Sequence, residues 1–259
     1  ADATAHEFYI DGEFQNPAEQ AKIGAVIDGL KPADEAGFVR VDTSNNMPTA
    51  AGLSSSSSGL SALVKACNRY YDLGLTQEEL AQKAKFASGS SSRSFFGPLA
   101  AWDKESGEIY KIQTDLKLAM IMLVLNDKQK PVSSREGMKR CMETSTNFKE
   151  WIEESRQDYK DMLDYLAGND FKQVGQLTER NALAMHATTR TATPAFSYLT
   201  EESHKAMDFV RDLRAAGHAC YFTMDAGPNV KVLCLEEDLD QLVPLFDARY
   251  RTIVSKTKD

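Results

Sequence analysis

The sequence predicts an α+β fold in which helices pack on a mixed sheet. Several segments repeat apolar residues at the three- and four-residue spacing of an amphipathic helix. Other segments alternate apolar and polar residues, or are apolar throughout, as half-buried and fully buried strands are. Short turn sequences, Asp11-Gly12 and Gly227-Pro228-Asn229, join pairs of these strands. Two layers, helix on sheet, accommodate all of these segments.

The chain is expected to begin with a hairpin, because "HEFYI" and the residues after Asp11-Gly12 flank a dipeptide that favours tight turns. A helix at 21–30 follows from "AKIGAVIDGL", and a half-buried strand at 37–43 from "GFVRVDT". Five consecutive serines then precede a helix. Its apolar face contains Leu60, Leu63, Val64, Cys67 and Tyr71.

A second helix is predicted directly after Thr76. This threonine is a suitable N-cap, and Glu79 completes a capping box three residues later. Strands are expected at 107–114 and 117–125, from "GEIYKIQT" and "KLAMIMLVL". The second of these is apolar without interruption, so it should be buried on both faces.

The second half of the chain is mainly helical. Residues 143–185 have the helical spacing, and "GND" at 168–170 divides them into two helices. A further helix is expected at 201–216 and another around Leu239 to Phe246. Strands are expected in "HACYFTMDA", "NVKVLCL" and "YRTIVS".

Composition and charge restrict the class of protein. With 259 residues and 42% hydrophobic residues, the chain can form a sizeable core or two modest ones. We place the domain boundary at the charged stretch around Pro131, giving domains 1–130 and 131–259. A net charge of −8 argues against a nucleic-acid partner, because phosphate backbones require clustered Lys and Arg.

Location and cysteine usage point to the cytoplasm. The longest apolar stretch, "LAMIMLVL", is too short to cross a bilayer, so no membrane partner is expected. "ADATAHEFYI" has neither a basic leader nor an apolar block. The four cysteines form no C-x-x-C pair, and we interpret them as buried free thiols in a reducing compartment.

The serine-rich stretch "NNMPTAAGLSSSSSG" is the first candidate site. A helix start presents unpaired backbone N–H groups and a positive dipole end, which suit an anion such as phosphate. Gly52 lets the backbone approach a ligand closely, and Ser54, Ser55 and Ser56 add hydroxyl donors. The stretch is neither a P-loop nor a dinucleotide fingerprint. The alternative is a serine N-cap on a buried helix.

Two further serine-rich stretches each contain one arginine. In "ASGSSSRSFFG", Ser88 and Ser90 precede Arg93, whose guanidinium can bind a carboxylate or phosphate in bidentate fashion. The following phenylalanines indicate that this loop is attached to the core. "KPVSSREG" places Ser134 and Arg135 at another helix start. The alternative for both is a solvated capping loop.

A lone aspartate, Asp225, ends an apolar strand in "TMDAGPNVKV". Its carboxylate could orient or deprotonate a hydroxyl nucleophile during phosphoryl transfer. The structural alternative is an Asx-turn. The four histidines show no metal-ligand spacing with each other or with cysteine, so no protein metal site is predicted.

These stretches together resemble the GHMP small-molecule kinase superfamily, whose phosphate-binding motif is matched at residues 48–56. Within it, the chain is similar to the mevalonate diphosphate decarboxylase family. "NNMPTAAGLSSSSSG", "ASGSSSRSFFG", "PVSSREGM", "NALAMHATT" and "YFTMDAGPNVKV" match that family in order and spacing. The resemblance implies a ribosomal protein S5 domain 2-like N-terminal domain, a ferredoxin-like C-terminal domain and a cytoplasmic homodimer.

The resemblance also implies an activity and its residues. The expected reaction is the ATP-dependent decarboxylation of (R)-mevalonate 5-diphosphate to isopentenyl diphosphate, ADP, phosphate and CO2, with Mg²⁺ bridging the ATP phosphates. Asp225 and Arg93 are the implied catalytic residues. The implied substrate-binding residues are Ser88, Ser90, Arg93, Ser134 and Arg135, and the implied ATP-binding residues are Asn46, Ala51, Gly52, Ser54, Ser55 and Ser56.

Two alternatives remain open. Another GHMP kinase, acting on mevalonate or phosphomevalonate, would phosphorylate without decarboxylating. A non-catalytic nucleotide-binding protein is favoured only if the Lys-Tyr-Trp-Gly-Lys segment, which opens the family and is not found here, is truly missing. We expect a chain that begins at Ala1 to be inactive or very weak, because strand pairing and substrate contacts would be lost.

Overall fold

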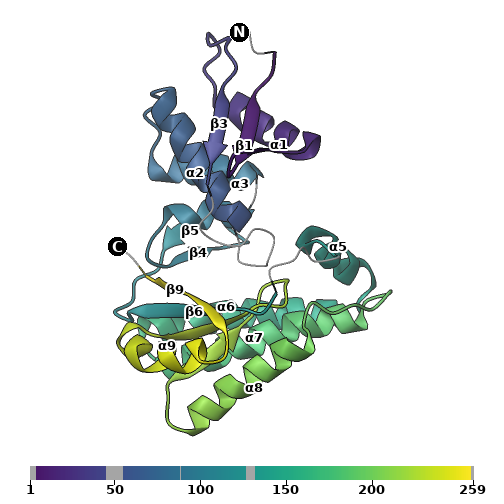
Figure 1. The fold of residues 1–259 in the computed structure, drawn as a ribbon, viewed down its shortest axis with the longest axis vertical. Coiled ribbons are helices and arrows are strands. Elements are labelled where there is room, and N and C mark those ends of the chain that lie inside the picture. The colour runs from purple at the N-terminus through teal and green to yellow at the C-terminus, as the bar shows by residue number, and fades with distance from the viewer. Residues whose placement is uncertain (1–3, 45–54, 88, 127–131, 258–259) are drawn as a thin grey trace. The chain divides into compact units, whose positions relative to one another are not determined.

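The computed structural model describes residues 4–44, 55–87, 89–126 and 132–257 (Figure 1). They form two compact units that divide between Lys111 and Ile112. The boundary predicted from the sequence, 130/131, lies later. The difference arises because strand β6 (Leu118–Val124) pairs with strands from the end of the chain, so it belongs to the second unit.

The first unit begins with a three-stranded sheet in the order β2-β1-β3. Strand β1 (Glu7–Ile10) is antiparallel to β2 (Glu13–Phe14) and parallel to β3 (Arg40–Thr43). The predicted hairpin is present: Asp11 and Gly12 have φ of 51° and 83°, as a tight turn of the primed type requires. Strands β4 (Ala100–Trp102) and β5 (Ile109–Lys111) form a separate antiparallel pair, and β4 is not anticipated by the sequence pattern.

Helices cover this first sheet, and their starts are specified locally. The Asn16 side chain accepts hydrogen bonds from the first turn of α1 (Pro17–Asp28), where Pro17 fits the first helical position. The predicted capping box before α3 (Gln77–Ala87) is present, with Thr76 N to Glu79 Oε2 at 2.8 Å and Glu79 N to Thr76 Oγ1 at 3.2 Å. The other helices are α2 (Ser55–Tyr70), α4 (Gly89–Ser92) and the 3₁₀ turn η1 (Arg93–Phe95).

The core of the first unit is a single apolar cluster between these helices and strands. As the spacing predicts, Leu60, Leu63, Val64 and Cys67 of α2 are all buried. They meet residues of α1, α3 and β1, among them Ile27, Ala84 and Phe8. This packing holds α2 in place within the first unit.

The second unit contains a four-stranded antiparallel sheet in the order β7-β8-β6-β9. Its strands are β6, β7 (Cys220–Thr223), β8 (Val230–Leu235) and β9 (Arg251–Lys256). In this register Ile121 of β6 lies between Val232 and Val254. Leu118, Ile121 and Met122 are buried, which agrees with burial on both faces of the unbroken apolar run.

Five helices and a 3₁₀ turn accompany this sheet in the described part of the second unit. Gly168 ends one helix, Asn169 has φ of 56°, and Asp170 caps the next, so the predicted break at 168–170 is confirmed. The predicted helix from 143 differs, because a separate helix ends at Thr144 and the backbone of Ser145 is extended. The helices and the turn are α5 (Ser134–Thr144), α6 (Phe148–Ala167), α7 (Phe171–Thr191), α8 (Glu201–Ala215), η2 (Glu236–Asp238) and α9 (Leu239–Asp247).

Helices α7, α8 and α9 contribute to one core with the sheet. The fully buried side chains of Phe222, Val210 and Phe246 lie in this core. All four cysteines are buried and free, as predicted. Over the ranges that the structure describes, no helix has the length and apolarity that a membrane span needs.

Candidate functional site

The carboxylate of Asp225 lies just after the end of β7, in the loop that leads into β8. Its side chain is 49% exposed, whereas Lys231, which pairs with Asp225 Oδ2 through Nζ, is 10% exposed. Lys231 stands on β8 opposite Thr223. A buried cation therefore balances a carboxylate that still faces solvent.

The backbone around Asp225 is held by neighbouring elements. Its carbonyl oxygen accepts from Gly227 N at 2.7 Å and lies 3.1 Å from His186 Nε2 of α7. Ser203 Oγ of α8 donates to the carbonyl of Pro228 at 2.6 Å. Asn229 Oδ1 accepts from the backbone N–H of Leu125 at 2.7 Å, beyond the end of β6. Three elements thus fix the loop, so the carboxylate is presented from a rigid support.

His186 is almost fully buried, with 3% exposure. Burial lowers its pKa to about 4, because the imidazolium would lose its hydration. The ring is therefore neutral at neutral pH. Since a carbonyl oxygen can only accept, the contact with Asp225 requires that the proton be on Nε2.

The side chain of Tyr198 connects His186 to the start of helix α5. Tyr198 packs edge to face against His186, with ring centroids 6.2 Å apart, and donates its hydroxyl hydrogen to Ser133 O at 3.0 Å. Ser133 is the N-cap of α5, and its Oγ accepts from Glu136 N at 3.2 Å. Ser134 and Arg135, the next two residues, are both exposed. The helix start can therefore offer amide groups and a guanidinium to an anion.

Ser90, one of the candidate residues, belongs to a group of serines that joins α2 to α4. Ser90 Oγ lies 2.6 Å from Ser57 Oγ. Ser61 Oγ donates to the carbonyl oxygens of Ser57 and Ser91, both at 2.8 Å. Ser91 and Ser92 are completely buried. Part of the serine richness therefore serves helix packing, which small side chains permit.

Arg93 begins η1 and is exposed. The segment after it is attached to the core as the sequence predicts, because Phe95 is 5% exposed and Gln77 Nε2 donates to its carbonyl oxygen. Arg93 is thus an exposed cation on an anchored turn. It belongs to the first unit and Asp225 to the second, so their meeting stays a prediction.

Other predicted site residues lie outside the described residues. These are Asn46, Ala51, Gly52, Ser54 and Ser88. Ser55 and Ser56 form the start of α2, and their side chains also lie outside the description. Helix α2 has no acidic residue in its first turn, which agrees with an anion site there.

The sequence pattern did not identify His186, Tyr198 or Lys231 as parts of the site. Lys231 had a signal, since a lysine interrupts the apolar run "NVKVLCL". His186 was set aside because it has no metal-ligand spacing. Within the described ranges no group of three or more His, Cys, Asp or Glu side chains could hold a metal ion.

Both units match profiles of known families. Residues 1–112 match the diphosphomevalonate decarboxylase-like N-terminal domain, and residues 120–258 match the mevalonate 5-diphosphate decarboxylase C-terminal domain. Similar solved structures have the GHMP kinase fold, and the chain is an α+β protein of that class. More narrowly, the chain belongs to the mevalonate 5-diphosphate decarboxylase family.

Similar proteins come from bacteria and fungi. Mevalonate pyrophosphate decarboxylase from Streptococcus pyogenes is 66% identical, with a TM-score of 0.94 over 99% of this chain and 81% of its own. A protein described as MDDEF in complex with MVAPP, AMPPCP and magnesium is 37% identical, with a TM-score of 0.90 over 98% of this chain and 81% of its own. Diphosphomevalonate decarboxylase of Candida albicans is 31% identical over 218 residues, which are 80% of this chain; the chain spans 60% of that curated relative.

Proposed function

We propose that the protein catalyses the ATP-dependent decarboxylation of (R)-mevalonate 5-diphosphate to isopentenyl diphosphate, ADP, phosphate and CO2. Membership of the family supports the reaction. The single observation that carries the assignment is the carboxylate of Asp225, which is half exposed, paired with Lys231 and held on an anchored loop. A carboxylate supported in this way can accept a proton from a substrate hydroxyl.

The proposed chemistry has two stages. Asp225 orients the tertiary hydroxyl and takes its proton while the oxygen attacks the γ-phosphorus of ATP, and ADP leaves. The C–O bond that now carries the phosphoryl group then breaks, and the group leaves as phosphate. The bond to the substrate carboxylate breaks as CO2 departs, and its electron pair forms the double bond.

Each anion of the two substrates has a proposed partner. Arg93, with Ser88 and Ser90, holds the substrate carboxylate, because its guanidinium matches a carboxylate in bidentate fashion. Ser134 and Arg135 hold the diphosphate at the exposed start of α5. These contacts would keep a positive side chain next to each negative group of the substrate while the phosphoryl group is transferred.

ATP is proposed to bind with its phosphates at the start of α2, through Asn46, Ala51, Gly52, Ser54, Ser55 and Ser56. A sixteen-residue helix with no acid in its first turn suits this role. The MDDEF complex with AMPPCP and magnesium supports the same pair of cofactors. Magnesium would be carried chiefly by the phosphates, because such ions keep few protein ligands.

Assembly as a cytoplasmic homodimer belongs to the same proposal and rests on the family resemblance. Sedimentation equilibrium of the purified protein would test the assembly. A single species at the monomer mass at micromolar concentration would contradict it.

The role of Asp225 is tested by Asp225→Asn, which keeps the size of the side chain and removes the base. We expect kcat to fall by about 10²- to 10⁴-fold, the usual contribution of a general base, with the Kd for ATP unchanged. Asp208→Asn is the matched control, because Asp208 is an exposed aspartate that pairs with Arg211 on α8. Equal turnover in the two variants would remove the proposed role.

The reaction products distinguish the proposed decarboxylase from a kinase that only phosphorylates the substrate. Carboxyl-labelled substrate should release labelled CO2 in step with ADP. Phosphorylated substrate without gas release would instead assign a GHMP kinase that does not decarboxylate.

A further inference from the structure

We propose that His186 and Tyr198 are positioning residues that hold the Asp225 loop and the start of α5 in register with one another. This inference rests on the proposed function, since it assumes that Asp225 and the residues Ser134 and Arg135 act on one substrate. Neither side chain is given a chemical step. Both act through the backbone of residues that would contact substrate.

The first link is the contact between His186 and the carbonyl oxygen of Asp225, 3.1 Å from Nε2. His186 Nδ1 is buried and has no hydrogen-bond partner among the residues that the structure describes. The contact through Nε2 therefore orients the ring. The same hydrogen bond fixes the peptide group that follows Asp225. The Gly227 N–H donates a second hydrogen bond to this carbonyl oxygen.

The second link is Tyr198, which is 7% exposed and lies between His186 and the start of α5. Its hydroxyl donates to Ser133 O at 3.0 Å. Gly137, one turn into α5, leaves room for this ring: a Cβ there would lie 2.1 Å from the Tyr198 hydroxyl. The first turn of α5 therefore packs directly against Tyr198.

These links connect two segments that are far apart in the sequence. The chain of contacts runs from Asp225 through His186 and Tyr198 to Ser133, and every member lies in the second unit. In the proposed function, Asp225 at one end of this chain of contacts holds the reacting hydroxyl, and the start of α5 at the other end holds the diphosphate. The packed side chains between them then fix the distance between these two groups of the substrate. Small displacements from such a geometry lower the rate strongly.

The test uses steady-state CO2 release by the intact protein. His186→Leu should lower kcat by about 10-fold or more and leave the KM for ATP within about twofold. His186→Gln should recover most of this loss, because its amide nitrogen can reach the same carbonyl oxygen. Tyr198→Phe keeps the ring and removes the hydroxyl, so it should raise the KM for the diphosphate substrate by about fivefold with little change in kcat.

A matched control and a second measurement separate positioning from stability. Val210→Ala removes volume from the core of the second unit, on α8, and should leave kcat unchanged. Hydrogen exchange followed by mass spectrometry should be faster at residues 223–230 in His186→Leu, but not in His186→Gln. It should also be faster at residues 133–140 in Tyr198→Phe.

Specific outcomes would overturn the inference. Wild-type kcat in His186→Leu, an equal loss in the leucine and glutamine variants, or unchanged exchange in both segments would each do so. A wild-type protein that releases no CO2 would defeat the proposed function instead, and the exchange measurement would still decide whether the two side chains hold these segments.

Discussion

A neutral histidine in a protein interior makes folding sensitive to acid. His186 is nearly inaccessible to solvent and its pKa is about 4 in the folded protein, against about 6.5 when exposed. The main cause is burial, which opposes the charged form; the nearby charges of Arg190 and His204 act in the same direction. The hydrogen bond to Asp225 O and the charge of Asp225 act in the opposite direction.

We therefore predict that His186 makes the free energy of unfolding fall on acidification. Between pH 6.5 and 4 the unfolded chain binds a proton at this residue that the folded chain does not. The contribution is fully present above pH 6.5 and is lost as the pH approaches 4, by about 3 kcal/mol in total. Urea unfolding of wild type and His186→Gln at pH 7, 5.5 and 4 measures the difference. Parallel pH profiles would contradict the prediction.

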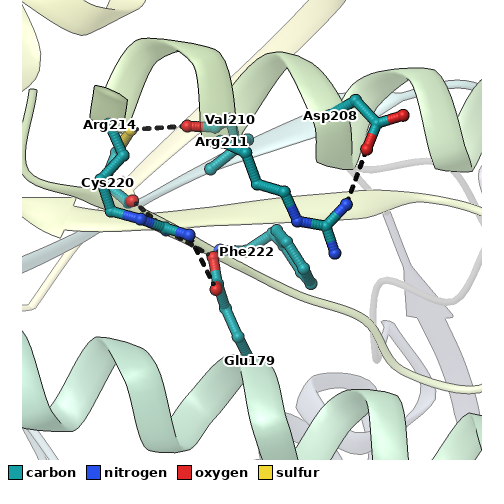
Figure 2. Close-up of polar contacts among 7 residues, drawn as sticks. All are labelled: Glu179, Asp208, Val210, Arg211, Arg214, Cys220 and Phe222. Atoms are coloured by element: carbon teal, nitrogen blue, oxygen red, sulfur yellow. Dashed lines mark hydrogen bonds and ion pairs between the residues drawn. The ribbon is translucent and has the colours of Figure 1, made fainter. Parts of the chain in front are cut away.

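At the scale of elements, strand β7 illustrates how an edge strand is completed by side chains. On its outer edge, the Phe222 N–H donates to Glu179 Oε1 at 3.0 Å, and the Cys220 carbonyl oxygen accepts from Arg214 Nη1 at 2.9 Å (Figure 2). Glu179 of α7 and Arg214 of α8 also pair with each other, at 2.7 and 3.1 Å. The two side chains thus occupy backbone groups that a further strand would otherwise use.

Removing the carboxylate should therefore leave the Phe222 N–H without an acceptor and Arg214 without its counter-charge. We predict that Glu179→Leu destabilises the second unit by about 3 kcal/mol, because the Phe222 N–H loses its acceptor and Arg214 loses its ion-pair partner in a partly buried place. Glu179→Gln keeps an acceptor and should cost about half as much. Urea denaturation at pH 7 would measure both variants. Equal losses in the free energy of unfolding for the leucine and glutamine variants would show that the hydrogen bond to the strand edge does not contribute to stability.

Helix α7 approaches β7 closely because of a glycine. A Cβ at Gly175 would lie 2.0 Å from Tyr221 Cδ2, and the tyrosine ring is confined by Phe171 and Arg214. We predict that Gly175→Ala destabilises the protein by about 2 kcal/mol in spite of its better helix propensity. Gly59→Ala on α2 is the matched control: its Cβ meets nothing within 4 Å, so it should stabilise by about 0.5–1 kcal/mol. Thermal unfolding of both variants would show opposite shifts.

At the scale of the whole molecule, each unit has a core of its own. The buried residues of the second core all lie between Ala119 and Phe246, and those of the first lie between Phe8 and Ile109. The contacts of Thr114 and Asp115 with Asn169 also stay within the second unit. A domain with a complete core can fold independently.

We accordingly predict that a fragment of residues 112–259 unfolds in a single cooperative urea transition. Its fluorescence and far-ultraviolet circular dichroism transitions should coincide. A fragment starting at residue 131 should not fold, because it lacks β6, the strand between β8 and β9. Cooperative folding of the shorter fragment would contradict this assignment of the boundary.

Local chemistry accounts for what the sequence could predict. The Asp11-Gly12 turn, the Thr76–Glu79 capping box and the break at 168–170 depend on neighbouring residues, and all three are present. The domain boundary depends on which distant strands pair with β6, and no local pattern records that. The anchoring of Asp225 by His186 likewise joins a helix to a loop 39 residues away. The sequence pattern singled out Asp225, whose carbonyl oxygen is the acceptor, but not His186, which supplies the donor.

The central place of β6 also has a consequence for biosynthesis. Ile121 pairs with Val232 and Val254, so both partner strands leave the ribosome more than a hundred residues after it. At usual rates of translation the delay is on the order of ten seconds. During that time "LAMIMLV" has its apolar side chains and both hydrogen-bonding edges uncovered. The nascent chain should therefore recruit chaperones through this segment while the first unit has already folded.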